Sequence, residues 1–202
     1  NCVIQYLDKD QEDMDKLIYH VEDPISGTSI HSVWNIFKSI KQESNLKVVL
    51  DGQGADEFLC GYFSMFPHLF ADMIHKGHVL SCLSEFYAVT HKYKISPKKA
   101  LILDTFRATA PNIFENTLSA LGKKTVYHPD FNQAKNGFLG YTLRLLRRTI
   151  EPQQHWQDRC SMAFSIEARQ PFLDYRLVEL MLALPHHFKL RNGETKFVLR
   201  KT

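Results

Sequence analysis

The spacing of apolar residues predicts short strands and amphipathic helices in the amino-terminal part of the chain. Apolar side chains recur at i, i+3, i+4 and i+7, the repeat of a helix with one buried face, at Val33, Ile36, Phe37 and Ile40. Short apolar runs predict strands at Val3–Leu7 and Lys47–Leu50. A second helix is expected over Met14–Val21, and Pro24 prevents its continuation. A strand, helices and a second strand in this order predict a right-handed β–α–β crossover in a parallel sheet.

The rest of the chain is predicted to be mostly helical. Residues 66–148 show only helical patterning and turns, with breaks or helix starts at Pro97, Pro111-Asn112 and His128–Asp130. The aromatic segment Phe63–Phe70 is expected to form core rather than a cofactor site. Another packed helix is predicted from Leu177, Leu180, Met181 and Leu184. The sequence therefore predicts the α/β class, with a truncated parallel-sheet core and a predominantly helical remainder.

The residues that follow the Lys47–Leu50 strand have the composition of an anion-binding loop. In the segment Asp51-Gly52-Gln53-Gly54-Ala55-Asp56-Glu57, two glycines separate a strand end from a new helix start. Loops at the carboxyl ends of strands are where α/β sheets bind ligands. Gly52 and Gly54 would permit positive φ and a close approach of the backbone to a bulky anion. The following helix would direct free N–H groups at the same point.

The carboxylates in this loop would repel a phosphate unless a cation lay between them. Mg²⁺ accepts one or two carboxylates together with phosphate oxygens and waters, so Asp56 and Glu57 are the predicted metal ligands. The alternative is an acidic, glycine-rich surface turn. A calcium-binding EF-hand loop is excluded, because it would need acidic residues where Gln53 and Ala55 stand.

Three segments together resemble the glutamine-hydrolysing asparagine synthetases. Asp51–Glu57 with Gly61-Tyr62 is similar to the family signature S/D-G-E/Q-G-A/S-D-E-x-x-x-G-Y. Asp158–Met162 and Ile166–Asp174 resemble its D-R-x-S-M and E-x-R-x-P-F-L-D segments. Gly193–Arg200 resembles its G-x-x-K-x-x-L-R helix start. The order of these motifs identifies the chain as part of the carboxy-terminal synthetase domain, and the resemblance implies an adenine-nucleotide α-hydrolase-like (HUP) core.

Two features of that family are not found in residues 1–202. One is the S-G-G-x-D-S loop that grips the ATP pyrophosphate, for which Ile25–Ser29 lacks the paired glycines and the aspartate. The other is the glutaminase domain with its C-G-I start, because Cys2 is followed by Val3-Ile4-Gln5. Cys2 is instead expected to be a small hydrophobic residue on a strand. We therefore expect a partial synthetase domain of a longer protein, inactive and a weak binder of ATP by itself.

The resemblance implies ATP-dependent amide synthesis with Mg²⁺. In the implied reaction ATP activates the side-chain carboxylate of aspartate as β-aspartyl-AMP, and ammonia from glutamine displaces AMP to give asparagine. Asp51, Gly52, Gly54, Asp56 and Lys196 would bind ATP or pyrophosphate.

Lys196 is predicted to lie in the first turn of a helix, where the helix dipole disfavours a cation. A lysine in an unfavourable place suggests a function, and the resemblance implies that its ammonium acts on the phosphates during catalysis. A solvated lysine on an exposed helix is the alternative.

Glu167, Arg169 and Asp174 surround the apolar Pro171–Leu173 segment, which suggests charges held in place rather than moving freely in water. Arginine is a natural bidentate partner of carboxylates. Arg169 either pairs with Glu167 or Asp174 as a structural ion pair, or faces an acidic substrate or a phosphate.

Gln53, a candidate catalytic residue, departs from the glutamate of many asparagine synthetases. Because a neutral amide cannot act as a base, the acceptor is left open between aspartate and another carboxylate, as in surface-polysaccharide or secondary metabolism. A non-catalytic domain that retains the fold also stays open. Another member of the ATP-pyrophosphatase group, such as an argininosuccinate or GMP synthetase, is a further alternative. Those enzymes lack the E-x-R-x-P-F-L-D segment that this chain resembles, which argues against it.

The composition limits which binding partners and which cellular location are predicted for this protein. With 44% hydrophobic residues the chain is predicted to be ordered, and a net charge of +3 from scattered side chains argues against nucleic acid. The four cysteines lack the spacing of a zinc site or a disulfide framework, and the ten histidines are expected at the surface or in caps. Without a signal peptide or long apolar run, a cytoplasmic protein with no membrane partner is predicted. The resemblance implies a glutaminase domain in the parent chain and leaves a homodimer open.

Overall fold

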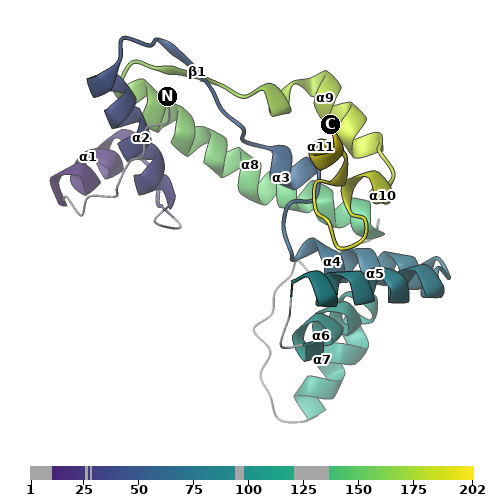
Figure 1. The fold of residues 1–202 in the computed structure, drawn as a ribbon. Coiled ribbons are helices and arrows are strands. Elements are labelled where there is room, and N and C mark those ends of the chain that lie inside the picture. Colours follow the sequence, from purple (N-terminus) through teal and green to yellow (C-terminus); the bar gives the residue numbers. More distant parts are fainter. Residues whose placement is uncertain (1–10, 26, 28, 94–97, 121–136) are drawn as a thin grey trace. The chain divides into compact units, whose positions relative to one another are not determined.

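A computed structural model describes residues 11–25, 27, 29–93, 98–120 and 137–202 (Figure 1). The chain divides into two compact units. The first unit comprises residues up to 53 together with 148–174, and the second comprises 54–147 and 175–202. The predicted strand at Val3–Leu7, Pro97 and the predicted loop at His128–Asp130 lie outside the described residues.

The first unit contains the helices and the strand that the apolar pattern predicted. Helix α1 (Gln11–Val21) and helix α2 (Ser29–Glu43) contain the two predicted helical stretches, and strand β1 spans Val48–Leu50. The long helix α8 (Gly137–Ala163) contributes its carboxy-terminal part. Strand β2 (Glu167–Arg169) and a 3₁₀ turn at Pro171–Leu173 complete the unit.

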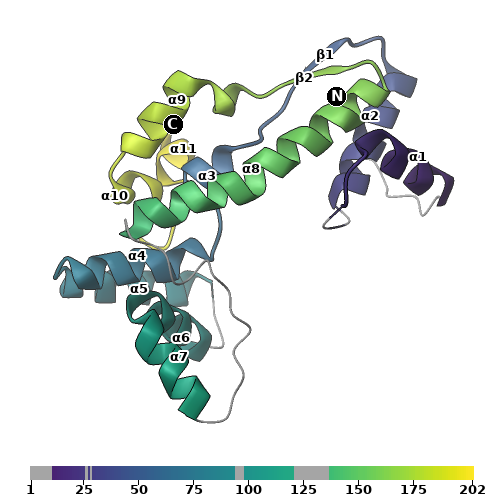
Figure 2. The same cartoon turned by 180° about the vertical axis from the view of Figure 1, so that it is seen from behind.

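Strands β1 and β2 form a parallel pair in which Val48, Val49 and Leu50 lie opposite Glu167, Ala168 and Arg169 (Figure 2). The ladder extends beyond both strands, because the Asp51 N–H donates to the Arg169 carbonyl at 2.8 Å and the Glu167 N–H donates to the Lys47 carbonyl at 2.8 Å. The partner of β1 among the described residues is thus a downstream segment that was not predicted as a strand. Glu-Ala-Arg has no intrinsic strand preference, so pairing with β1 determines its conformation.

The core of the first unit gathers the apolar faces of α1 and α2 against the end of α8. Trp34 and Phe37 are buried, and the Trp34 ring contacts the Phe164 ring edge-on at 4.7 Å between centroids. Val33 and Ile40 pack against this core, whereas Ile36 is exposed, so one position of the predicted apolar stripe faces away. Burying a side chain of this size stabilises the fold by roughly 1.5–3 kcal/mol.

The second unit is helical, as predicted for the described residues between 66 and 147. It contains nine elements or parts of elements: α3 (Ala55–Phe58), α4 (Met65–His75), α5 (Val79–Lys92), α6 (Lys98–Thr109), α7 (Pro111–Ala120), the start of α8, α9 (Tyr175–Ala183), α10 (His186–Lys189) and α11 (Phe197–Lys201). The predicted break at Pro111-Asn112 is confirmed, because α6 ends at Thr109 and α7 begins at Pro111. Proline suits a first helical position, where its missing N–H costs no hydrogen bond.

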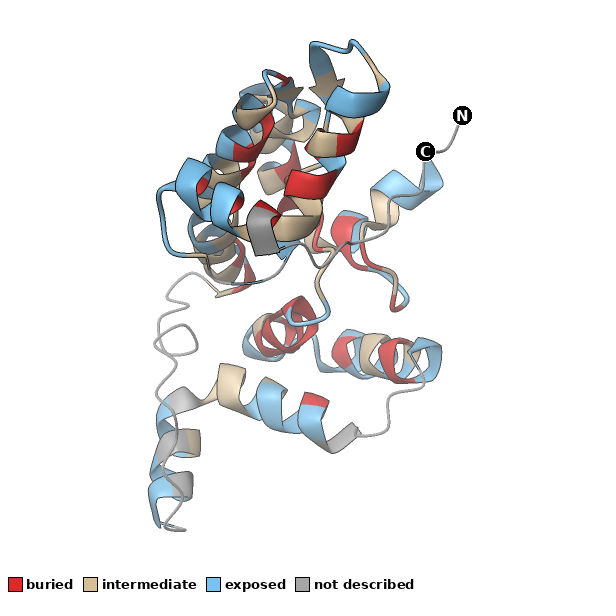
Figure 3. Cartoon of the chain, turned by 90° about the vertical axis from the view of Figure 1, so that its left-hand side faces the viewer, coloured by how far each residue is buried: buried red, intermediate tan, exposed pale blue. Residues whose placement is uncertain are grey.

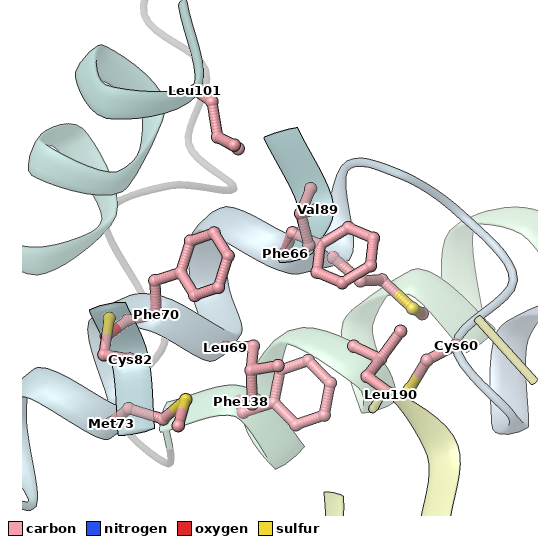
Figure 4. Close-up of a cluster of buried hydrophobic side chains, with 11 residues drawn as sticks. Cys60, Phe66, Leu69, Phe70, Met73, Cys82, Val89, Leu101, Phe138 and Leu190 are labelled. Carbon is pink, nitrogen blue, oxygen red and sulfur yellow. The ribbon is translucent and has the colours of Figure 1, made fainter. Parts of the chain in front are cut away.

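The core of the second unit surrounds α4, whose side chains are buried along most of its length (red in Figure 3). Phe66 and Phe70 are completely buried, which confirms that the Phe63–Phe70 segment belongs to the core. Figure 4 shows this cluster of buried side chains, formed by Cys60, Met65, Phe66, Leu69, Phe70, Met73, Cys82, Val89, Leu101, Phe138 and Leu190.

His68 corrects the expectation that the histidines lie at the surface or in caps. It is buried on α4, and its ring stacks on the Tyr141 ring with centroids 3.6 Å apart. Burial and the nearby Arg144 guanidinium lower the pKa of His68 to about 4, so its imidazole is neutral at physiological pH.

The structure is therefore a mixed, mainly helical fold with a small parallel sheet, compatible with a fragment of an α/β domain. Across the described ranges, no helix combines enough length with enough apolar character to span a bilayer.

Candidate functional site

The predicted phosphate loop leaves β1 at its carboxyl end, and the boundary between the two units along the sequence falls within it. Asp51, Gly52 and Gln53 belong to the first unit, whereas Gly54, Asp56 and Glu57 belong to the second.

In the first unit, two glutamines of α8 hold the side chains on either side of Gly52. The Gln157 amide donates a hydrogen bond to the Asp51 carboxylate, and the Gln53 amide donates to the Gln153 carbonyl oxygen at 2.5 Å. Gln153 and Gln157 lie one helical turn apart, so they occupy the same face of α8. Neither glutamine was predicted from the sequence, although their i, i+4 spacing just before the Asp158-Arg159 motif was a usable signal.

A pocket of about 360 Å³ lies beside Asp51 and Gln53, within the size range of small-molecule sites. The polar side chains in its lining are a carboxylate, amides and a hydroxyl, and none of its described lining residues is cationic. Such a lining suits a neutral ring or hydroxyl-bearing group better than an acid. The lining residues are Ser29, Ile30, Val33, Ile36, Phe37, Ile40, Val49, Leu50, Asp51, Gln53, Gln153, Trp156 and Gln157.

The two loop glycines have different conformations. Gly54 is buried, precedes α3 and has φ 96°, a left-handed conformation that favours glycine. Gly52 is exposed and does not have positive φ, and a Cβ built on it would meet no atom within 4 Å. The expectation of positive φ is confirmed at Gly54 and wrong at Gly52. Helix α3 also has only four residues, so its dipole is smaller than the predicted helix start implied.

Alanine at these two positions is expected to have opposite effects. Gly54→Ala should destabilise the protein by about 1–2 kcal/mol, the cost of a left-handed non-glycine residue. Gly52→Ala should leave stability unchanged, because its Cβ would meet no atom within 4 Å. If the loop binds phosphates as the sequence predicts, this Cβ should obstruct their approach to the backbone and weaken ATP binding by the full-length protein. Urea unfolding and calorimetric titration would measure the two effects, and equal destabilisation by both variants would contradict this assignment.

In the second unit, Asp56 and Lys196 come together from motifs far apart in the sequence. The Lys196 Nζ lies 2.8 Å from the Asp56 Oδ1, and the two side chains are 24% and 42% exposed, respectively. The Lys196 N–H also donates to the Leu59 carbonyl at 3.1 Å. Both groups thus meet at a position that a ligand can reach from solvent.

The backbone at Lys196 differs from the prediction. Lys196 stands immediately before α11 rather than in the first turn of a helix, and its φ of 51° is left-handed. A left-handed lysine is strained, and such residues persist only where the surrounding contacts over-determine them, commonly at functional sites.

Gly61 is the residue that makes room for this pair. A Cβ built on Gly61 would lie 1.6 Å from the Asp56 Oδ1 and 2.7 Å from the Lys196 Cε. The Gly61 N–H also donates to the Asp56 carbonyl at 2.7 Å. The glycine of the Gly61-Tyr62 motif therefore has a steric role that only the structure reveals.

Glu57, the residue that follows Asp56, is only 2% exposed. It accepts a hydrogen bond of 2.6 Å from the Tyr62 hydroxyl. Burial raises the pKa of the Tyr62 phenol, and the hydrogen bond to Glu57 and the charges of Glu57 and Asp56 raise it further. The other carboxylate oxygen of Glu57 remains available as a metal ligand, but the side chain is buried, so it would have to become accessible to bind one.

Asp56 provides a suitable oxygen donor for Mg²⁺. Within the described part of the chain, no group of three or more His, Cys, Asp or Glu side chains converges on one point. Mg²⁺ commonly binds one or two carboxylates, with substrate phosphates and waters as its other ligands. The accessible carboxylate of Asp56, which pairs with the Lys196 ammonium, could supply one such ligand, and the metal roles of Asp56 and Glu57 both stay predictions.

Arg169 pairs with Glu167, one of its two predicted carboxylate partners, at 2.8 Å between Nε and Oε1. The hydrogen bond to Glu167 and its charge raise the pKa of Arg169. Both side chains are more than half exposed, so this is an ion pair at the surface, and its structural or substrate-binding role stays a prediction. The exposure follows from β2, which places residues 167 and 169 on the same face of the strand.

The profile of the family described as asparagine synthase matches residues 4–202. The chain belongs to the asparagine synthase family. This confirms the resemblance drawn from the three motifs.

Known members of the asparagine synthase family cover most of this chain at low identity. The chain is 25% identical to glutamine-hydrolyzing asparagine synthetase 1 of Bacillus subtilis (strain 168), in an alignment that covers 94% of the chain and 32% of that protein. It is 28% identical to glutamine-hydrolyzing asparagine synthetase 2 of the same organism, over 92% of the chain and 23% of that protein. The chain thus spans about a third or less of the length of these relatives. No solved structure matches it significantly.

Proposed function

We propose that this chain is part of an enzyme that makes an amide from a carboxylate, ATP and ammonia, with aspartate as the acceptor and glutamine as the ammonia source. The observation that carries the proposal is the Asp56–Lys196 pair. Two motifs of the asparagine synthase family, distant in sequence, bring a carboxylate and an ammonium within 2.8 Å at an accessible position.

The reaction has two steps. A carboxylate oxygen of the acceptor attacks the α-phosphorus of ATP, and the bond to the bridging oxygen breaks to release pyrophosphate. The nitrogen of ammonia then attacks the acyl carbon and loses a proton, while AMP leaves with the electron pair of the acyl–oxygen bond.

Asp56 and Lys196 have complementary roles in the first step. Asp56 would bind Mg²⁺, with the buried Glu57 as a second ligand if its free carboxylate oxygen becomes accessible. Bound Mg²⁺ would neutralise phosphate charge. The Lys196 ammonium faces the charge that develops on the departing pyrophosphate, so it stabilises the transition state more than the ground state.

The remaining loop residues are proposed to bind other parts of the nucleotide. Gly52 and Gly54 would present backbone N–H groups to the phosphates. The pocket beside Asp51 is proposed to bind the nucleoside, because its carboxylate and amides can hydrogen-bond ribose hydroxyls or ring nitrogens, whereas a dicarboxylate would find no cation in it. These assignments imply a HUP-type fold for the complete domain, of which residues 1–202 are a part, and a glutaminase domain elsewhere in the protein.

The Gln53–Gln153 hydrogen bond leaves a second acceptor class open. Both partners are neutral amides, so neither of these two side chains can act as a base or attract the α-ammonium of aspartate by its charge. We therefore keep a related carboxylate as the alternative acceptor. Measuring AMP release by the full-length protein with aspartate and with a panel of other carboxylates would separate the two acceptor classes.

Asp56→Asn tests the proposed metal role. Asparagine retains an oxygen but loses the charge that attracts a small, hard cation. ATP–pyrophosphate exchange by the full-length protein should collapse and recover partly at high Mg²⁺. The melting temperature should stay within a few degrees, because partly exposed ion pairs contribute at most about 1 kcal/mol.

Asp104→Asn, at an exposed position on α6, is the matched control and should leave exchange unchanged. Exchange that survives in Asp56→Asn at ordinary Mg²⁺, together with a lower melting temperature, would make Asp56 a structural residue. Absence of exchange in the unmodified full-length protein with any carboxylate would favour a non-catalytic domain.

A further inference from the structure

The turn that precedes Lys196 is attached to helix α5 through the side chain of Glu85. One carboxylate oxygen of Glu85 accepts the Gly193 N–H at 2.7 Å, and the other accepts the Asn192 N–H at 2.9 Å. Asn192 and Gly193 are both left-handed, with φ 52° and 69°. Consecutive N–H groups in such a turn form a concavity for an anion, and here the anion is a side chain of the same unit.

Two more contacts join the same turn to α5. A Cβ built on Gly193 would lie 2.9 Å from the Ala88 carbonyl oxygen, so the turn packs directly on the α5 backbone. The Lys92 Nζ lies 3.0 Å from the Glu194 Oε1. Glu85, Ala88 and Lys92 follow one another at helical spacing, so a single face of α5 makes all three contacts.

Further contacts hold the backbone between this attachment and Lys196. Reciprocal backbone hydrogen bonds of 3.1 and 2.9 Å between Arg191 and Glu194 close the turn. Thr195 is buried, and the Lys196 backbone is bonded to Leu59. The left-handed backbone of Lys196 is thus held directly by Leu59 and, through the preceding turn, by Glu85.

We propose that Glu85 is a positioning residue for the proposed amide synthesis. It contacts neither Asp56 nor Lys196 through its carboxylate, and it acts by holding the turn from which Lys196 reaches Asp56. This inference rests on the proposed function, because a position set for Lys196 matters to turnover only if Lys196 takes part in the reaction. The sequence contains no local signal for Glu85, which lies in the helical region that otherwise carries no candidate chemistry.

The test compares Glu85→Ala and Glu85→Gln in the full-length protein, with Glu179→Ala on the exposed face of α9 as the control. Amide hydrogen exchange at Asn192 and Gly193 should accelerate at least about tenfold in Glu85→Ala. Turnover should fall by about ten- to a hundredfold with little change in the KM for ATP, the effect expected when a catalytic group is displaced slightly. Glu85→Gln keeps one acceptor oxygen, so its exchange rates and turnover should lie between those of the unmodified protein and Glu85→Ala. If Glu85→Ala does not fold, Glu85→Gln still tests the proposal.

A double-mutant cycle distinguishes positioning from general stabilisation. If Glu85 acts through Lys196, adding Glu85→Gln to Lys196→Ala should lower turnover no further. The positioning role would be overturned if Glu85→Gln lowered turnover by the same factor in the unmodified protein and in Lys196→Ala. Normal turnover despite faster amide exchange in the turn would also overturn it. Normal turnover in Lys196→Ala alone would instead overturn the proposed function, whatever the exchange rates show.

Discussion

Replacing Lys196 with alanine is expected to lower amide formation by the full-length protein at least about a hundredfold while the protein stays folded. The loss corresponds to removal of one preorganised group that stabilises developing charge in the transition state. The effect on stability should be small, because the Asp56–Lys196 pair is partly exposed to solvent and such pairs contribute about 0–1 kcal/mol. Steady-state kinetics and thermal unfolding on the same preparations would measure both quantities.

Two further substitutions at residue 196 sharpen this expectation. Lys196→Gly removes the ammonium but suits the left-handed backbone, so it should be at least as stable as Lys196→Ala and equally inactive. Lys196→Arg should restore activity only partly, since a planar guanidinium differs from a compact ammonium. Lys41→Ala, on the exposed end of α2, is the control. Near-normal amide formation by Lys196→Ala would place Lys196 outside the reaction.

Gly61→Ala is expected to reduce ATP–pyrophosphate exchange by more than about a hundredfold, although it changes neither Asp56 nor Lys196. The new Cβ would overlap the Asp56 Oδ1 at 1.6 Å and crowd the Lys196 Cε at 2.7 Å. Both groups must therefore move from the positions in which they meet, and misplaced catalytic groups lose most of their effect. The clash involves the ends of flexible side chains, so the protein should still fold.

Removing the overlapping carboxylate tests the steric explanation directly. Asp56→Ala combined with Gly61→Ala should recover the stability lost in Gly61→Ala alone, a non-additive result expected for residues in contact. Exchange activity should not recover. Gly27→Ala is the matched control, because a Cβ there would meet no atom within 4 Å. Normal exchange in Gly61→Ala would mean that the Asp56–Lys196 geometry is not used.

The local pattern predicted some elements correctly and others not at all. The apolar repeat in residues 33–40 and the run before Asp51 correspond to α2 and β1, because such periodicities report which side of a single element faces a core. Strand β2 could not be found in this way, since Glu-Ala-Arg becomes a strand only through its ladder with β1. Burial of His68 likewise depends on α8, which supplies the Tyr141 ring.

The candidate site likewise has features that the sequence predicted and features that only the structure revealed. The residues Asp51–Glu57, Glu167, Arg169 and Lys196 were identified from motifs, and the positive φ at Gly54 followed from its glycine. The pairings were not, because they join α8 to the loop in the first unit, and in the second they join the segment before α11 to α3 and to α5. Gln153, Gln157, Gly61 and Glu85 acquire roles only through these pairings.

The sequence by itself determined the family, the main helices and the residue types of the candidate site, because motifs and helical repeats consist of residues that are close together in the sequence. Tertiary structure alone decided that Lys196 is left-handed and paired with Asp56, that Gly61 must lack a side chain, and that Arg169 is exposed. The physical reason is that these properties depend on distances between groups remote in sequence. Such distances are set when separate elements pack against one another, and no local preference of the residues concerned specifies them.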